Sequence, residues 1–254
     1  MGAASYSERP VPYGLATHAC CAWTQVAGPD GHVQRVLPDG CADVVWVEGV
    51  RLELAGPATE PVLVDIPPGA TVLGVRFGPG AAGPALGLGA HELRDQTVAL
   101  DALWGTAANE LAERLADAAP AARPVLLADA VAKRLRDARP PDALVARAAT
   151  LLARGVPVSA TSREVALGAR HLCRRFHDAV GYGPKTLQRI LRLRRFLALA
   201  EAAPRPDLAR AAAEAGYTDQ PHLTRECGEL AGLTPVALLA ARRGPAARPV
   251  LPLL

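Results

Sequence analysis

The sequence predicts a two-domain α+β protein, with a small β-barrel or β-sandwich followed by helices and then an all-helical domain containing two helix-turn-helix units. The first observation is length, because 254 residues suffice for two domains of ordinary size. The second is periodicity, which changes from short alternating segments before residue 78 to helical spacing after residue 104. The third is composition: 50% of the residues are hydrophobic and 21% are charged, which is typical of a chain that buries a core.

Charge is divided unevenly along the chain. Residues 1–140 contain 11 Lys or Arg and 16 Asp or Glu, a net charge of −5, whereas residues 141–254 contain 17 and 9, a net charge of +8. A basic half beside an acidic half indicates a polyanionic partner for the basic half. A well-solvated helical surface would have a similar composition, so charge alone leaves both interpretations open.

The N-terminal part has the pattern of several short strands. Residues 1–17 contain Pro, Gly and Ser and predict an irregular lead-in. Segments of partly alternating polarity, separated by turns such as GPDG and PDG, follow at residues 19–26, 33–37, 41–47, 51–54, 61–65 and 71–77. Short strands with frequent turns predict a small barrel or sandwich. The glycine-rich stretch 78–89 matches no phosphate-binding loop and is interpreted as a connection into a helix.

Two amphipathic helices are predicted next. Residues 104–118 place Trp104, Ala108, Leu111 and Leu115 at helical spacing, and residues 124–136 do the same for Leu127, Val131 and Leu135. Residues 139–142, Arg-Pro-Pro-Asp, are the best candidate for a linker. The expected boundaries are therefore a β-rich domain at 1–104, a helical segment at 105–140, a helical domain at 141–243 and a tail at 244–254.

A first helix-turn-helix pattern lies at residues 162–185. A short helix ends near Val165, a turn covers residues 166–168 and a second helix covers residues 169–180. The apolar residues Leu172, Phe176 and Ala179 fall on one face of this second helix, and Arg170, Arg174 and His177 project the other way. A basic helix at 184–203 connects this unit to the next.

The second pattern lies at residues 207–235. A helix at 207–215 runs into Gly216, which can adopt the positive φ of a tight turn, and Asp219 can cap the helix that follows. That helix carries Leu223, Cys227 and Leu230 on one face, with Arg225 nearly opposite. An ordinary helical hairpin would explain one such pattern. Two in succession favour helix-turn-helix units whose second helices enter the major groove of DNA.

The region from about residue 159 to residue 235 resembles the DNA-binding domain of AraC/XylS-family transcription regulators. The matching segments are LGARHLCRRF, VGYGPK, Arg192 in the connecting helix, AAAEAGYTDQPHLTREC and LAGLTP. The segments LPDGCADVVWVEG and GVRFGPGAA are similar to the sensor half of a less characterised branch of that family, which implies a cupin-like fold. The resemblance implies a non-enzymatic regulator that binds double-stranded operator DNA. A small-molecule effector, a homodimer partner and RNA polymerase are its further candidate partners.

The resemblance also implies which residues contact DNA. Arg170 and Arg174 match base-contacting positions, consistent with their outward direction, because Arg can donate two hydrogen bonds to guanine. His171 and Arg175 lie toward the flanks, where phosphate contacts or local salt bridges are expected. In the second unit the matching contacts are Gln220, Thr224 and Arg225. Arg192 matches a structural arginine, and His222 is expected to be structural or to face a phosphate.

The first unit departs from the family pattern in its turn. Ala166 stands where a glycine is usual, and Ser162 where a small packing alanine is usual. Gly168 replaces the usual capping Ser, a small loss because Gly caps nearly as well. In the second unit Cys227 stands where Phe is typical. These departures leave the geometry of the first turn open.

In the segments that resemble the cupin-like sensor, the sequence argues against an enzyme. His18, His32 and His91 form no HxH arrangement, so neither a metal site nor another cofactor is expected and a cupin-type enzyme is disfavoured. The helices predicted within residues 104–136 could pack against their own sheet, or they could pair two subunits, as the resemblance implies. Both alternatives remain open. The sequence contains no run of about 18 apolar residues, so no membrane-spanning helix is predicted.

The five cysteines, Cys20, Cys21, Cys41, Cys173 and Cys227, include no CxxC pair. An odd number without this motif favours a reducing, cytoplasmic compartment. A thiol switch using Cys20, Cys21 and Cys41 is an alternative. Small buried hydrophobes are the favoured interpretation, because only one of two adjacent strand cysteines could approach Cys41.

Overall fold

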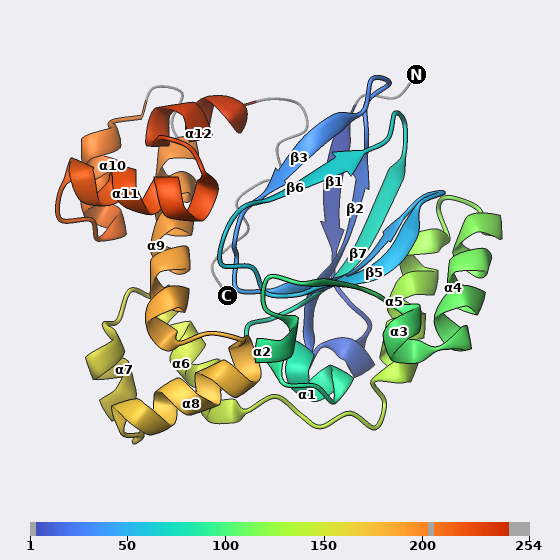
Figure 1. Cartoon of the computed structure of the whole chain (residues 1–254), viewed down its shortest axis with the longest axis horizontal. Coiled ribbons are helices and arrows are strands. Elements are labelled where there is room, and N and C mark those ends of the chain that lie inside the picture. Colours follow the sequence, from blue (N-terminus) through green and yellow to red (C-terminus); the bar gives the residue numbers. More distant parts are fainter. Residues whose placement is uncertain (1–3, 203–205, 244–254) are drawn as a thin grey trace.

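The computed structural model describes residues 4–202 and 206–243 and contains a strand-rich N-terminal part and a helical C-terminal part (Figure 1). The strands are β1 (Ser5–Arg9), β2 (Ala19–Val26), β3 (His32–Val36), β4 (Ala42–Val47), β5 (Arg51–Ala55), β6 (Val62–Ile66), β7 (Thr71–Phe77) and β8 (Thr97–Ala99). The N-terminal helices are η1 (Tyr13–Leu15), α1 (Ala82–Leu86), α2 (Ala90–Leu93), α3 (Asp101–Trp104), α4 (Thr106–Asp117) and α5 (Arg123–Arg134). The C-terminal helices are α6 (Ala143–Ala153), α7 (Val158–Glu164), α8 (Ala169–Val180), α9 (Pro184–Glu201), α10 (Leu208–Ala215), α11 (Gln220–Ala231) and α12 (Pro235–Ala241). The predicted α+β fold class is confirmed.

The described strands form two antiparallel sheets. One has six strands in the order β1-β2-β7-β4-β5-β8, and the other pairs β3 with β6. Side chains of β4 alternate between the two faces of the larger sheet: Val44 and Trp46 belong to one cluster, and Val45 and Val47 to another. Two sheets that face each other make the open sandwich rather than the closed barrel among the predicted alternatives.

Helices α4 and α5 cover one face of the six-stranded sheet. Leu111, Leu115, Leu127 and Val131 are buried in the same cluster as Val75 of β7. In Figure 1 both helices stand on the side of the sheet away from the C-terminal part. Of the two alternatives for residues 104–136, the structure therefore shows the apolar stripes packed on their own sheet.

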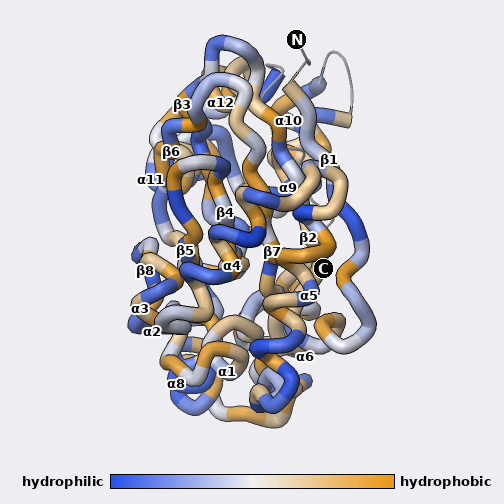
Figure 2. The backbone as a smooth tube through the Cα atoms, turned by 90° about the vertical axis from the view of Figure 1, so that its right-hand side faces the viewer, coloured by the Kyte–Doolittle hydropathy of each residue, from blue (hydrophilic) through white to orange (hydrophobic). Residues whose placement is uncertain are grey.

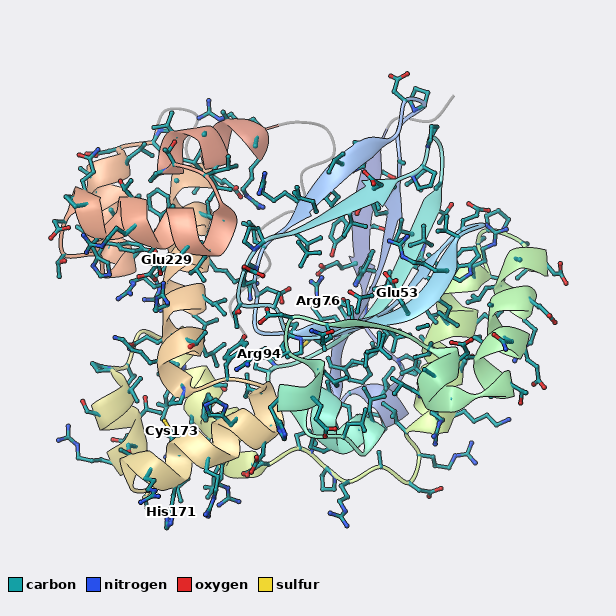
Figure 3. The ribbon with its side chains drawn as sticks, in the orientation of Figure 1. Glu53, Arg76, Arg94, His171, Cys173 and Glu229 are labelled. Atoms are coloured by element: carbon teal, nitrogen blue, oxygen red, sulfur yellow. The ribbon has the colours of Figure 1, made fainter. Side chains whose placement is uncertain are left out.

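The opposite face of this sheet packs against β3 and β6. The Trp23 ring lies directly over Gly74, where a Cβ atom would come within 2.1 Å of it, so a residue without a side chain is required there. Trp23 donates a hydrogen bond of 2.6 Å from Nε1 to Asp43, which also pairs with the buried Arg76 at 3.2 Å. Figure 3 shows Arg76 within the N-terminal part. Between the two sheets, therefore, an ionic pair accompanies the apolar contacts.

The structure corrects several predicted elements. Residues 1–17 are not wholly irregular, because β1 pairs with β2 as an edge strand and η1 buries Leu15. Four of the five residues of β1 are exposed, so its sequence lacks the alternation of polar and apolar residues seen in half-buried strands. Its conformation therefore depends on pairing with β2. The helix predicted at 104–118 is divided at Gly105, whose φ of 61° and ψ of −142° separate α3 from α4. Ala203, the predicted end of the connecting helix, and the tail 244–254 lie outside the described residues.

The two parts are in extensive contact. Helices α1 and α2 pack against α8, and Figure 2 shows α1 beside α8. Leu37 packs against the C-terminal core, and Arg194 of α9 donates a hydrogen bond of 3.1 Å to the Asp39 carbonyl. Arg35 donates one of 3.0 Å to the Ala231 carbonyl at the end of α11. The N-terminal part thus contacts both helix-turn-helix units and the helix between them.

Candidate nucleic-acid interface

The first unit consists of α7, a tight turn and α8. The turn passes through Ala166, whose φ is 53°, a value that favours glycine. The Ser162 hydroxyl donates a short hydrogen bond to the Leu167 carbonyl, and the Leu167 amide donates one of 3.0 Å to the Ser162 carbonyl. Ser162 therefore stabilises this first turn, whose geometry was left open because its sequence departs from the family pattern.

The facing of α8 agrees with the prediction from sequence. Leu172 and Phe176 are fully buried and Ala179 is nearly so. The exposed side chains include the four predicted contacts on this helix, Arg170, His171, Arg174 and Arg175, together with His177. In Figure 3 the His171 side chain points away from the body of the protein. The helix thus presents a cationic surface to solvent.

Arg175 differs from the other exposed cations of α8 because, among the described residues, it has an acidic partner. Its Nε atom lies 2.7 Å from Oδ2 of Asp142, at the end of the linker. The other oxygen of Asp142 caps α6 by accepting hydrogen bonds from the amides of Leu144 and Val145. Local salt bridging, one of the two roles expected for Arg175, is therefore observed.

The second unit has a turn of conventional composition. Gly216 ends α10 with a φ of 96°, and Asp219 caps α11 by accepting a hydrogen bond of 2.7 Å from the His222 amide. Leu223, Cys227 and Leu230 are buried. The three predicted contacts on this helix, Gln220, Thr224 and Arg225, are exposed. The predicted inward and outward faces of α11 are therefore confirmed.

A buried carboxylate, which the sequence reasoning did not identify, holds α11 against α9. Glu226 is only 3% exposed and pairs with Arg192 of α9 and with His222 Nε2 at 3.2 Å. The Arg192 guanidinium also lies 5.0 Å from the centroid of the Tyr217 ring, and burial raises the pKa of Tyr217. Arg192 and His222 are thus structural, as expected. Glu226 follows His222 at i+4, the spacing that could have indicated this pair.

Two further cations lie beside α11. A groove of about 330 Å³ is lined by Lys185, Arg189 and Arg192 from α9 and by Arg225 from α11. Lys185 is exposed and, within the described part of the chain, bonds only the neutral Gln188, whereas Arg189 pairs with Glu229. The i, i+4 spacing of Lys185 and Arg189 is the sequence signal that would have included them. Lys185 is therefore an additional candidate for contact with a phosphate.

The cysteines lie apart from these exposed faces, with Cys173 as the exception on α8. All five are free thiols. Cys21, Cys41 and Cys227 are buried, whereas Cys20 is exposed, contrary to the expectation of a buried hydrophobe at that position. Burial raises the pKa of Cys21 and of Cys227 to about 12, and that of Cys41 well above its usual value. The thiolate is the reactive form, so these groups are weak nucleophiles at neutral pH. This favours the packing interpretation over a thiol switch.

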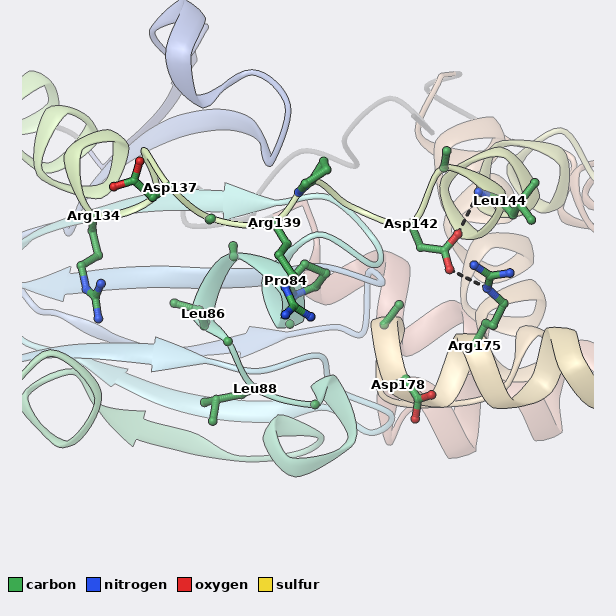
Figure 4. Close-up of a pocket in the computed structure, with 18 of the residues that line it drawn as sticks. Pro84, Leu86, Leu88, Arg134, Asp137, Arg139, Asp142, Leu144, Arg175 and Asp178 are labelled. Atoms are coloured by element: carbon green, nitrogen blue, oxygen red, sulfur yellow. Dashed lines mark hydrogen bonds and ion pairs between the residues drawn. The ribbon is translucent and has the colours of Figure 1, made fainter.

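A cavity of about 1140 Å³ lies where the two parts meet (Figure 4). Its walls come from α1 and the residues that follow it, from Trp104 and Arg134, from the linker and the start of α6, and from α8. Within residues 4–202 and 206–243, no group of three His, Cys, Asp or Glu side chains could hold a metal ion. No helix in those residues has the length and apolar composition needed to span a membrane.

Comparison with known proteins identifies a DNA-binding domain in the C-terminal part of the chain. Residues 161–241 match the family model described as "Helix-turn-helix domain", and residues 9–99 match the "Domain of unknown function (DUF6597)". No curated protein matches the sequence. ToxT from Vibrio cholerae O395 aligns with a TM-score of 0.46 and 11% identity, over 86% of this chain and 97% of ToxT. The first match covers α8 and α11, so the predicted AraC-type helix-turn-helix domain is confirmed.

Proposed function

We propose that this chain, which carries an AraC-type helix-turn-helix domain at its C-terminal end, is a sequence-specific transcription regulator that reads DNA with α8 and α11. The observation that carries this proposal is the position of the two helices. They lie near opposite ends of α9 (Figure 1), and each exposes polar or cationic side chains. At 1.5 Å per residue the 18 residues of α9 span about 27 Å, close to the roughly 34 Å of one turn of DNA. One subunit can therefore reach two successive major grooves.

The exposed residues are assigned to two kinds of contact. Arg170, Arg174 and Arg225 project from the centres of the exposed faces and read base edges, where a bidentate Arg contact discriminates guanine. Gln220 and Thr224, at the start of α11, read bases or hold the adjacent backbone. His171 and Arg175 lie on the flank of α8; His171 contacts a phosphate, which helps to fix the register of the protein on DNA, and Arg175 can do so when it is released from Asp142.

The N-terminal part is proposed to sense a small molecule, to form a homodimer, or both. Its contacts with α8, α9 and α11 support the first role, because a change in this part would reach both recognition helices. A regulator of this kind acts on transcription through its operator, with RNA polymerase as the further candidate partner. No specific observation favours an enzymatic activity.

Selection of genomic DNA fragments by the purified full chain tests the proposal. Sequencing of the retained fragments is expected to reveal a shared motif with two elements about one helical turn apart. Binding to that motif is expected to weaken steeply with added salt, because cationic contacts release counterions. Retention of fragments without a shared motif, or no retention above that of a heat-denatured sample, would contradict it.

A further inference from the structure

The cavity between the two parts touches the N-terminal helices α1, α3 and α5, the linker, the start of α6 and α8. Pro84, Leu86 and Leu88 form one wall, Trp104 and Arg134 another, and the linker and α8 complete it. Pro84, Leu86, Leu88 and Trp104 are partly exposed, and Leu86, Leu88 and Trp104 pack at the margin of the N-terminal core. Ligand sites combine such apolar surface with a few directed polar groups. The volume and lining therefore suit a small molecule with an apolar body.

Charged groups of both signs line this cavity: Arg134, Arg139 and Arg175, together with Asp137, Asp142 and Asp178. Figure 4 shows the guanidinium groups of the exposed residues Arg134 and Arg139 extending toward α1 and the residues that follow it, whereas the carboxylates of Asp137 and Asp178 point away. Among the described residues no carboxylate pairs with Arg134 or Arg139; Arg134 lies 6.0 Å from the centroid of the Trp104 ring. Two guanidinium groups without an acidic partner favour an anionic ligand.

The backbone that carries Arg139 is held in place. His18, a buried residue of the N-terminal part, forms a hydrogen bond of 3.0 Å from Nε2 to the Arg139 carbonyl. This contact joins residues 121 positions apart and fixes the linker beside the cavity. The position of the Arg139 side chain therefore depends on the folded N-terminal part and not only on local linker conformation.

The same cavity reaches the first recognition helix through an ion pair. Asp142 and Arg175 both line it, and their 2.7 Å contact connects the linker to α8. Both side chains are partly exposed, at 23% and 43%, so the pair is weak enough to be shifted by a new charge. An anion bound nearby would compete with Asp142 for Arg175 and would add negative charge beside a DNA-binding helix.

We infer that this cavity is an effector site for a small organic anion with an aromatic or other apolar body. Arg134 and Arg139 bind its charged group, and Trp104 and the wall formed by Pro84, Leu86 and Leu88 contact its body. The bound anion acts on α8 through Asp142 and Arg175 and lowers affinity for DNA. This consequence rests on the proposed function, whereas the binding site itself does not.

A series of probes with one ring system and three charges tests the site. Calorimetric titration of the full chain with indole-3-acetate, indole-3-acetamide and tryptamine compares charges of −1, 0 and +1. The acid is expected to bind at least tenfold more tightly than the amide or the amine. Arg134→Ala and Arg139→Ala are each expected to weaken acid binding at least fivefold, and circular dichroism checks that they remain folded. Arg136→Ala is the matched control, because Arg136 is exposed on the same segment but does not line the cavity.

Three results would overturn the site: no binding of the acid, equal binding of all three probes, or acid binding that survives both substitutions. Gel-shift titration on the selected DNA motif then tests the consequence. Saturating indole-3-acetate is expected to lower the affinity of the wild-type chain for DNA at least threefold. It is expected to leave the DNA affinity of Arg139→Ala unchanged. A chain that binds DNA but not the acid keeps the proposed function and loses this site. A chain that binds the acid but no DNA motif keeps the site and loses the proposed function.

Discussion

At the scale of single residues, exposure separates the side chains that should read DNA from those that hold the fold. Arg174 and Arg225 are exposed, so replacing either by Ala should cost about 1–3 kcal/mol of specific binding with little change in melting temperature. Gel shifts and thermal unfolding check both values. Arg210→Ala, on the exposed face of α10, is the control that should alter neither. Arg192→Ala should instead lower stability by about 3 kcal/mol, because it leaves the buried Glu226 without its main cation. A melting temperature that falls for Arg174→Ala would show that its outward facing is wrong.

Ala166 allows a test of backbone strain. An L-residue in the left-handed region costs about 1–2 kcal/mol, and glycine avoids most of this cost but loses more chain entropy on folding. Ala166→Gly is therefore expected to raise the free energy of unfolding by about 0.5–1 kcal/mol. The same exchange at Ala213, inside α10 and exposed, should lower it by about 1 kcal/mol. Urea titrations of both variants measure the difference, and a loss of stability in both would mean that the turn does not require a positive φ.

The thiols differ in reactivity according to burial. Because the pKa of Cys21 and of Cys227 is raised to about 12, both remain protonated at pH 7.5, and they would form thiolates only as the pH rises toward that value. Iodoacetamide is expected to modify the exposed Cys173 first, then the exposed Cys20, whose pKa is raised, and to leave Cys21, Cys41 and Cys227 unmodified in the folded chain. Mass spectrometry locates the labels, and labelling in urea provides the fully reactive control. Rapid native labelling of Cys41 would return a thiol switch to consideration.

At the scale of elements, the sequence predicts whatever depends on local pattern. The predicted strands at 19–26 and 71–77 coincide with β2 and β7, and the inward faces of α8 and α11 match, because alternation and helical spacing encode which side is buried. The edge strand β1 has no such pattern and depends on β2 for its conformation. Pairs such as Asp142 with Arg175 and Glu226 with Arg192 join residues 33 and 34 positions apart, so no local spacing reveals them. The same holds for the cavity, whose walls come from four separate segments of the chain.

The ion pair between the linker and α8 can be tested without disturbing the helix cap. Asn caps a helix about as well as Asp, so Asp142→Asn should keep α6 and its stability while removing the charge that holds Arg175. Arg175 is then free for a phosphate, and DNA affinity is expected to rise severalfold at low salt with a steeper salt dependence. Asp207→Asn, the same exchange at the cap of α10, controls for the change in net charge. Equal effects of both variants would indicate that charge alone, rather than release of Arg175, is responsible.

At the scale of the whole molecule, the helical part has its own core but is not independent of the strand-rich part. One cluster of buried residues runs from Val145 to Leu239 and includes both helix-turn-helix units and α9. The N-terminal part contributes Leu37 at the margin of this cluster, and Gly40 of the N-terminal part lies against Leu187 of α9. Removal of residues 1–141 would therefore expose some apolar surface of α9 while leaving most of the core intact.

A fragment of residues 142–254 is expected to fold, because its internal core is retained, with a melting temperature below that of the full chain, because the contacts of α8, α9 and α11 with the N-terminal part are lost. It should bind the DNA motif selected by the full chain, since α8, α9 and α11 are all present. It should no longer respond to indole-3-acetate, because Trp104, Arg134 and Arg139 are absent. Circular dichroism, gel shifts with and without the acid, and a fragment carrying Arg174→Ala as the binding control measure these three properties. An unfolded fragment would show that the N-terminal part completes the helical core, and a folded fragment without DNA binding would show that it is needed to align the two units. A fragment that still responded to the acid would place the effector site within the C-terminal part.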